Sequence, residues 1–260
     1  MLGAAWAAVP ALAQVDVGDS SVLRKLVPAE TLEDAARQQY AQMLAQARSQ
    51  RALAPPGHPQ LERLQGIARR LIPFAAAWNP RAREWRWEVN LIGSKQINAF
   101  CMPGGKIAFY TGILDQLKLS DDEVAMVMGH EMAHALREHA RERIAKGQAT
   151  NLGLRLGAQL LGLGDWGGLA AGLGTELLTL QFSRSDESDA DLVGLELAAR
   201  AGFDPQASVS LWTKMDQATG ERQNGLAFLS THPSGPHRIR ELERNAPRVQ
   251  ALYEAARLAR

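Results

Sequence analysis

The sequence is poor in cysteine and has almost no excess charge. Its single cysteine, Cys101, excludes an internal disulfide framework and a cysteine-rich zinc site. The 29 basic and 28 acidic residues leave a formal net charge of +1, so there is no reason to expect nucleic acid as a partner. With 260 residues, 46% of them hydrophobic, the chain can form one substantial domain or two small ones.

The N-terminus lacks basic residues but is otherwise typical of an export signal. Residues 1–13, MLGAAWAAVPALA, are apolar and end in the small-x-small pattern that signal peptidase recognises. The stretch is too short to span a membrane, and no cysteine follows it to carry a lipid. We therefore expect a signal peptide at 1–13, a mature start at Gln14 and a periplasmic protein. The missing basic residues indicate a start codon further upstream, and the alternative is an ordinary apolar tail.

Hydrophobic spacing in the first half predicts helices followed by a small sheet. Apolar residues recur at helical intervals over 28–51 and 60–77, and we expect an N-terminal helical segment at 14–58. Alternation over 85–91 predicts a half-buried strand, and two further short strands are expected at 96–101 and 106–110. The sequence thus predicts an α+β fold, mainly helical, with a small and mostly antiparallel sheet.

Helix signals dominate the second half. Ser120 and Glu123 fit a capping box that opens a long helix, expected to run to about Lys146. Further helices are expected at 184–200, at 204–216 and from Pro236 onward. The glycine-rich stretch 151–180 is interrupted by charged residues, so helical pieces and loop are favoured over membrane insertion.

Two histidines on the long helix form a candidate metal site. His130 and His134 lie about 40° apart on one helical face, so their imidazoles can bind one tetrahedral Zn²⁺. Glu131 stands at the general-base position of H-E-x-x-H metallopeptidases, where it can reach a metal-bound water. The alternative is a helix with two surface histidines. Apolar neighbours predict a buried helix instead, in which these polar groups need partners.

The residues just after this motif do not offer a third ligand. The extended metzincin motif requires Gly and His where this chain has Arg137 and Ala140. His139 lies about 180° around the helix from His130, and we expect it to face solvent. The third ligand must therefore come from further along the chain.

An acidic segment supplies the best candidate, Glu187. Asp191 follows four residues later on the same helical face and could hydrogen-bond a ligand histidine, fixing its tautomer. The alternative for the whole segment is a solvated helix N-terminus, where acidic side chains favour the helix dipole. We expect that simpler role for Asp186 and Asp189.

Three motifs in order resemble a known family: HEMAH (130–134), SRSDESDAD (183–191) and THPSGPHRI (231–239). They resemble the HtpX-type and CAAX-prenyl-protease-type zinc endopeptidases, above all the soluble periplasmic LoiP- and BepA-like members. The resemblance covers about 60–245 and implies a gluzincin domain at 59–245, with a C-terminal helix end at 246–260. It also implies one Zn²⁺ per chain, with His130, His134 and Glu187 as ligands, Glu131 as base and Asp191 in the E-x-x-A-D pattern.

The resemblance implies roles for three further places in the chain. His232 would face the zinc, either donating to the developing oxyanion or occupying the open metal position in a resting state. Arg238 could orient it or support the oxyanion. Asn98, Ala99 and Phe100 would form a strand that borders the cleft and pairs with extended substrate. The alternatives are a packed loop histidine and, for Phe100, core packing.

The favoured interpretation is a zinc endopeptidase acting on unfolded or misassembled exported proteins. A zinc-bound, chaperone-like binding module with a self-closed cleft is the main alternative, although such a module would not need Glu131 as a base. A zinc hydrolase of non-protein amides also stays open. Polypeptides are the expected partners, with peripheral membrane association possible and the oligomeric state open.

Overall fold

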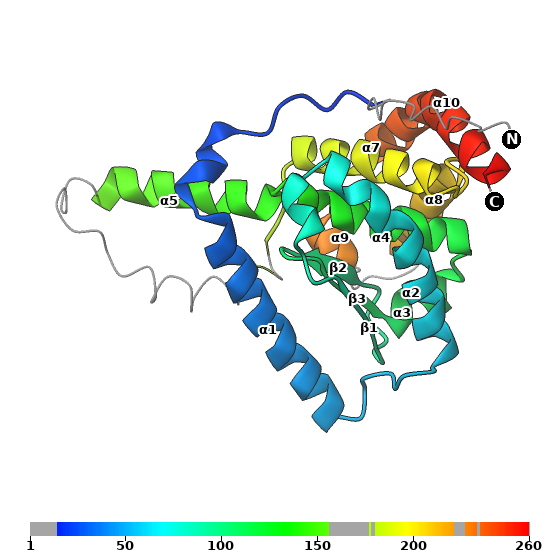
Figure 1. Cartoon of the computed structure of the whole chain (residues 1–260), viewed down its shortest axis with the longest axis horizontal. Coiled ribbons are helices and arrows are strands. Elements are labelled where there is room, and N and C mark those ends of the chain that lie inside the picture. Colours follow the sequence, from blue (N-terminus) through cyan, green and yellow to red (C-terminus); the bar gives the residue numbers. More distant parts are fainter. Residues whose placement is uncertain (1–14, 156–176, 178–179, 221–226, 233–234, 260) are drawn as a thin grey trace, which may run out of the picture.

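The computed structural model describes residues 15–155, 177, 180–220, 227–232 and 235–259 (Figure 1). Within them the expected α+β class is confirmed, because helices surround one small sheet. The helices are η1 (Val22–Leu26), α1 (Ala29–Ser49), α2 (Pro59–Leu71), η2 (Ile72–Ala77), η3 (Pro80–Arg83), α3 (Thr111–Leu117), α4 (Asp121–Leu136), α5 (His139–Arg155), α7 (Arg184–Arg200), α8 (Ala207–Gly220), α9 (Ala227–Thr231) and α10 (Pro236–Leu258).

The sheet has three strands in the order β1-β3-β2, formed by Glu88–Ile92, Lys106–Tyr110 and Ala99–Met102. β2 and β3 form an antiparallel hairpin, whereas β1 pairs with β3 in parallel. The sheet is therefore mixed rather than mostly antiparallel. The alternating pattern of apolar residues reveals a strand but not its place in the sheet, and placing β3 between β1 and β2 creates the parallel pair.

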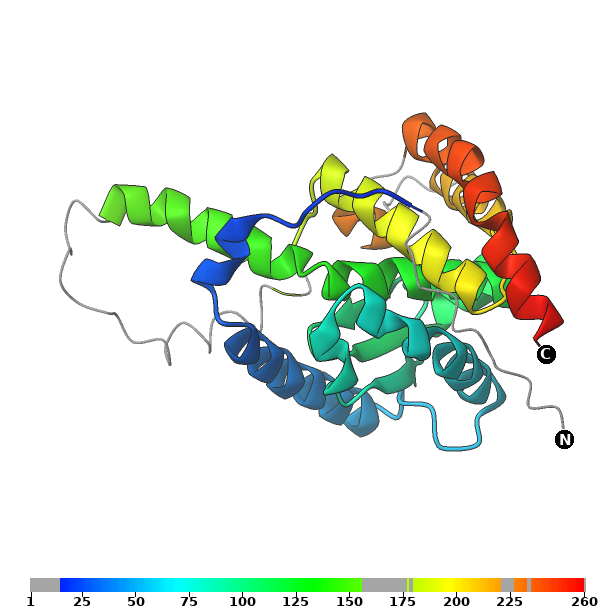
Figure 2. The same ribbon diagram turned by 45° about the horizontal axis from the view of Figure 1, so that its top comes forward.

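The hydrophobic core lies around α4, which packs on β2 on one side and on α7 on the other (Figures 1 and 2). A capping box of Ser120 and Glu123 opens α4 as expected, and most of its side chains are buried. Gly129 of α4 meets Gly194 of α7 where the two helices cross. A Cβ atom on Gly194 would lie 2.6 Å from the backbone nitrogen of His130, so this close approach requires glycine.

Two expected helices end earlier than their hydrophobic spacing suggested. The helix expected over 60–77 is α-helical only to Leu71 and continues as the 3₁₀ helix η2, because Pro73 has no N–H to donate. The helix expected to reach Lys146 ends at Leu136. Glu138 then takes a left-handed conformation, with φ of 60°, and a separate helix, α5, begins at His139.

The N-terminal part of the described chain packs on this core from two sides. α1 lies along the sheet, and the Tyr40 hydroxyl donates a hydrogen bond to the Ile107 carbonyl of β3. The segment before η1 runs along α7, where the Val15 N–H donates to the Glu196 carboxylate. Among the helices that the structure describes, none has the length and apolar character needed to cross a membrane. The expected signal peptide and most of the glycine-rich stretch lie outside the described residues.

Candidate metal centre

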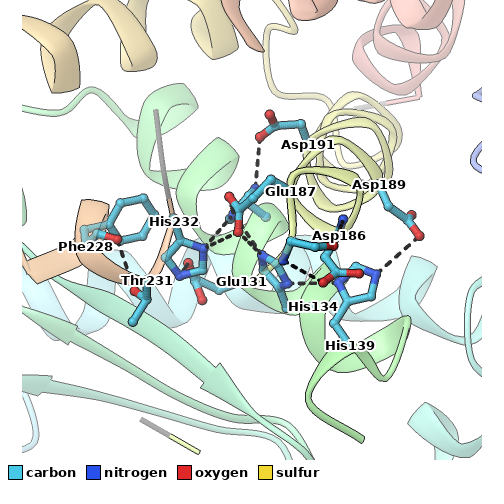
Figure 3. A network of polar contacts seen from close by, with 12 residues as sticks. Glu131, His134, His139, Asp186, Glu187, Asp189, Asp191, Phe228, Thr231 and His232 are labelled. Carbon is cyan, nitrogen blue, oxygen red and sulfur yellow. Dashed lines mark hydrogen bonds and ion pairs between the residues drawn. The ribbon is translucent and has the colours of Figure 1, made fainter. Parts of the chain in front are cut away.

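Four buried side chains converge between α4, α7 and the end of α9 (Figure 3). His130 and His134 come from adjacent turns of α4, Glu187 from the first turn of α7, and His232 directly follows α9. One potential ligand atom from each residue lies within 4.8 Å of the others. The structure thus brings together the three expected ligands and His232, although His130 and His232 are 102 positions apart in the sequence.

The distances between these atoms fit a zinc ion. Donor atoms bound to zinc at about 2.0–2.1 Å in a tetrahedron lie about 3.3–3.4 Å apart. Nε2 of His130 lies 3.1 Å from Nε2 of His134 and 3.5 Å from Oε2 of Glu187, and His134 Nε2 lies 3.4 Å from Glu187 Oε1. Imidazole and carboxylate are ordinary zinc ligands, so the cluster can hold one metal ion.

His232 lies where a fourth ligand would lie. Its Nδ1 is 3.3 Å from Nε2 of His130 and 3.0 Å from Oε1 of Glu187, while its Nε2 is 3.4 Å from Oε1 of Glu131. The side chain therefore faces both the expected ligands and the expected base. This arrangement is compatible with each of the two roles considered for it, oxyanion donor and resting-state ligand.

Asp191 and Arg238 contact the expected ligands and hold them in place. Asp191 Oδ1 lies 3.0 Å from Nδ1 of His130, the ring nitrogen on the other side from the cluster. Arg238 binds Asp191 through Nε and Nη2, each at 2.7 Å, and its Nη1 lies 2.6 Å from Oε2 of Glu187. Its guanidinium also stacks over the Trp212 ring, 3.7 Å from the centroid. Arg238 thus fixes both carboxylates of α7.

These contacts shift the pKa values of the buried groups in different directions. Burial holds the pKa of His134 well below its usual range, which favours the neutral imidazole that binds metal. Burial would also lower the pKa of His130, but Asp191 and Glu187 outweigh it and raise that pKa to about 9. For Glu187, burial is outweighed by hydrogen bonds from the three histidines, so its pKa lies below the ordinary value.

Glu131 lies beside the cluster with one oxygen available. Its side chain is buried, and Oε1 has no hydrogen-bond partner among the described residues. Burial raises the pKa of this carboxyl group, whereas the nearby His232 and His130 and the Cys101 backbone act in the opposite direction. Such a carboxylate can accept a proton from a water molecule placed between it and the metal ligands.

The solvent-facing position expected for His139 is wrong. His139 is buried, and its Nδ1 lies 2.9 Å from Nδ1 of His134. The expectation assumed one continuous helix, but α4 ends at Leu136 and the left-handed Glu138 interrupts the helical spacing before α5 begins. Helical spacing therefore no longer applies at residue 139.

The solvated role expected for Asp189 is wrong as well, whereas Asp186 does lie at a helix N-terminus as expected but is buried there. Asp186 is buried and closes the capping box of α7 with Ser183. Asp189 is half-buried, and its Oδ2 lies 3.3 Å from Nε2 of His139 and 2.9 Å from Nε of Arg137. The sequence showed only that these residues open a helix, not that Arg137 and His139 would lie against Asp189.

A cleft borders the cluster along β2. Its lining includes Asn98, Ala99 and Phe100 together with Glu131, His134 and His232. β2 is an edge of the sheet, and the Asn98 carbonyl accepts a hydrogen bond from the Tyr110 N–H of the neighbouring strand β3. Because partner bonds alternate along an antiparallel strand, the backbone groups of Ala99 and Cys101 point away from β3. The half-buried ring of Phe100 packs near Tyr40 and Tyr110 and also lines the cleft, so both interpretations of this side chain stay open.

Aromatic side chains that surround the histidines were not expected from the sequence. Phe182 stacks on His134 with ring centroids 3.9 Å apart, and Phe228 stacks on His232 at 4.5 Å. Both phenylalanines lie close in sequence to a motif: Phe182 directly precedes the acidic segment and Phe228 lies four residues before His232. That proximity is the only signal the sequence offers, since an apolar residue beside a motif is usually part of the core.

Comparison with known proteins bears on the family of the chain. The model of peptidase family M48 matches residues 59–246. The mitochondrial metalloendopeptidase OMA1 of Schizosaccharomyces pombe is 37% identical over 204 residues, covering 78% of this chain and 58% of that protein. OMA1 of Saccharomyces cerevisiae is 30% identical over 216 residues, covering 79% of this chain and 61% of that protein.

A bacterial relative is also similar. Metalloprotease LoiP of Escherichia coli is 28% identical over 198 residues, covering 75% of this chain and 73% of LoiP. The alignments with the two yeast proteins, by contrast, span less than two thirds of those proteins. The resemblance inferred from the three motifs is confirmed, and the chain belongs to peptidase family M48.

Proposed function

We propose that the protein is a zinc-dependent endopeptidase that hydrolyses peptide bonds of unfolded or misassembled exported proteins. The observation that carries this proposal is the buried cluster of His130, His134 and Glu187 with Glu131 beside it, at a cleft bordered by an edge strand. Family membership supports polypeptides as the substrate class. The match over 59–246 also supports our proposal that the peptidase domain spans 59–245, preceded by the helical segment 14–58.

In this proposal the two histidines and Glu187 hold the metal, and Glu131 moves the proton. Bound zinc would supply Lewis-acid chemistry, polarising the scissile carbonyl and making water more acidic. Glu131 accepts the proton of the attacking water and passes it to the leaving amine, for which its buried Oε1 is available. Asp191 accepts the Nδ1 proton of His130, which leaves Nε2 with a lone pair for the metal.

The edge of β2 explains why an unfolded segment would be the preferred substrate. An extended peptide can pair with the outward backbone groups of Ala99 and with the Cys101 carbonyl. This places it beside Glu131, to which the Cys101 N–H donates. A folded protein does not offer a free extended strand of this kind. Unfolding or misassembly would expose one, which is our reason for proposing a quality-control role.

The proposal of a periplasmic location rests on the composition of residues 1–13. The relatives do not decide between compartments, because OMA1 is named as mitochondrial and LoiP comes from a bacterium. The signal peptide and the export of the substrates therefore remain proposals.

One observation favours a second candidate function. Nδ1 of His232 lies 3.0 Å from Glu187 and 3.3 Å from His130, so His232 could fill the fourth metal position and close the site. A protein closed in this way would bind polypeptides with little turnover, as a chaperone-like module does. Glu131 favours the peptidase, because binding alone needs no base.

Digestion of an unfolded protein such as casein, with and without a chelator, separates these functions. The peptidase proposal expects cleavage that stops when zinc is removed and returns when zinc is added. His130→Ala, His134→Ala and Glu187→Ala should each lose the metal, measured as zinc per chain. Binding of casein without cleavage would favour the chaperone-like module, and full zinc content in Glu187→Ala would show that the third ligand is wrong.

A further inference from the structure

His139 connects a metal ligand to a carboxylate on another helix. It is the first residue of α5 and is buried between His134 of α4 and Asp189 of α7 (Figure 3). Its Nδ1 lies 2.9 Å from Nδ1 of His134, and its Nε2 lies 3.3 Å from Oδ2 of Asp189. Side chains from three helices thus form one continuous chain of contacts.

The chemistry of metal binding decides where the protons lie in this chain. Nε2 of His134 faces His130 and Glu187, so it must keep its lone pair for the metal and the ring proton must lie on Nδ1. That proton can be donated only to a lone pair, so Nδ1 of His139 is the acceptor. His139 then has its own proton on Nε2, where Asp189 accepts it.

We propose that His139 and Asp189 form a positioning pair that fixes the tautomer and ring orientation of His134 for the metal. This inference rests on the proposed function, since it presumes that His134 is a ligand. A metal-binding histidine commonly donates its other N–H to a second residue, and losing that partner typically costs about 10–100-fold in metal affinity. The structure assigns this partner to His139.

The two histidines of α4 are thus held in place by two separate sets of side chains. His130 reaches Asp191 directly, with Arg238 behind that carboxylate. His134 reaches Asp189 through the ring of His139, with Nε of Arg137 at 2.9 Å behind it. In each case a histidine is held by a carboxylate of α7, which is itself paired with an arginine. His139 is needed in the second case because its ring spans the distance between His134 and Asp189.

His139 is not itself a candidate ligand in this arrangement. It contacts Nδ1 of His134, the nitrogen that points away from His130 and Glu187. The group of described residues able to share one metal ion contains His130, His134, Glu187 and His232. His139 therefore acts through His134.

Zinc affinity of two His139 variants, measured by competition with a chromophoric chelator, tests the proposal. His139→Leu keeps an apolar side chain but removes the acceptor, and should weaken zinc binding about 10–100-fold. His139→Asn places an amide oxygen near the former Nδ1 and should recover most of that loss. His237→Leu is the matched control, because His237 is an exposed histidine of α10 and its loss should leave the affinity unchanged.

A spectroscopic measurement separates positioning from general destabilisation. The d–d absorption bands of the cobalt-substituted protein should change in His139→Leu, because a reoriented His134 alters the ligand geometry, and should return toward wild type in His139→Asn. If His139→Leu fails to fold, Asp189→Ala still tests the pair. Its zinc affinity and cobalt spectrum are then compared with those of the wild type and of His139→Asn. Asp189→Ala removes the far acceptor, so it too should weaken zinc binding and shift the bands.

Each outcome counts for or against the pair. Wild-type affinity and wild-type spectra in both His139→Leu and Asp189→Ala would overturn the inference while leaving the peptidase proposal intact, provided that the wild-type protein holds zinc and digests casein. A wild-type protein that holds no zinc would overturn the proposed function itself, and this inference with it. If His139→Leu and His139→Asn lose the same amount of zinc affinity while their cobalt spectra stay unchanged, His139 has only a packing role.

Discussion

At the scale of single residues, the two roles considered for His232 predict opposite effects of its loss. His232 lies within 3.0 Å of Glu187 and 3.4 Å of Glu131, so it contacts both the ligand cluster and the base. If it donates to the oxyanion, its loss removes a stabilising hydrogen bond in the transition state. If it fills the fourth metal position, its loss opens the site.

We expect His232→Ala to lower turnover, because both of its nitrogens already face catalytic groups. Loss of one oxyanion donor usually reduces kcat about 10²–10³-fold, and relief of a closed resting state would offset part of that effect. The measurement is kcat and KM on an unfolded substrate, together with zinc affinity. Unchanged turnover with unchanged zinc affinity would refute both roles and leave His232 a packed loop residue.

Residue types and spacing were enough to predict most of the candidate centre. The i,i+4 histidines, Glu131 between them and the carboxylates at 187 and 191 fall together because regular helices fix their directions. His139 could not be predicted in the same way. Its direction depends on the left-handed Glu138, and nothing in the local sequence marks a non-glycine residue for that conformation.

At the scale of elements, the crossing of α4 and α7 positions the centre. Gly129 and Gly194 let the helix backbones approach closely, which brings His130 to Glu187 and Asp191. The capping box predicted the start of α4, and the helix expected at 184–200 matches α7, whereas α4 was expected to reach Lys146 and ends at Leu136. Sequence analysis did not identify this crossing, since a glycine within a helix has no local sign of the neighbour it meets.

Gly194→Ala should destabilise the protein and loosen the metal centre. The new Cβ would lie 2.6 Å from the His130 nitrogen and 2.8 Å from the Gly129 carbonyl carbon, and backbone atoms cannot move aside as flexible side chains can. Overpacking of this kind costs about 1–3 kcal/mol. The midpoint temperature of thermal unfolding and the zinc affinity should both be lower than in the wild type.

Gly66→Ala in α2 is the control for this substitution. The nearest atom to its new Cβ is the terminal Nη2 of Arg69, 3.8 Å away, so helix propensity should dominate and stability should hold or rise by about 0.5–1 kcal/mol. A Gly194→Ala protein as stable as wild type, with the same zinc affinity, would show that the crossing tolerates a side chain.

At the scale of the whole molecule, the fold class could be predicted but the arrangement of its parts could not. Helical and alternating patterns identified the α+β class and most elements. The order of the three strands and the path of the segment before η1 along α7 depend on contacts between distant residues, such as Val15 with Glu196. Such long-range pairing leaves little trace in local periodicity.

For the chain as a whole, we predict export to the periplasm with removal of the N-terminal segment. The apolar residues 1–13 end in a signal-peptidase pattern, so protein recovered from cells should begin at or near Gln14 and fractionate with the periplasm. Mass spectrometry of the intact protein and cell fractionation measure both properties. An intact Met1 on the mature protein would remove the basis for a periplasmic location.

The most direct test of the account is the zinc content and peptidase activity of Glu131→Gln. Glu131 lies beside the ligands but outside the set that converges on the metal, so the substitution should leave about one zinc per chain. It should remove nearly all cleavage of an unfolded substrate, since loss of a general base typically costs about 10²–10⁴-fold in rate. Zinc retained with activity lost is the predicted result. Activity near that of the wild type would contradict the assignment of Glu131 as the base, and loss of zinc would contradict its separation from the ligands.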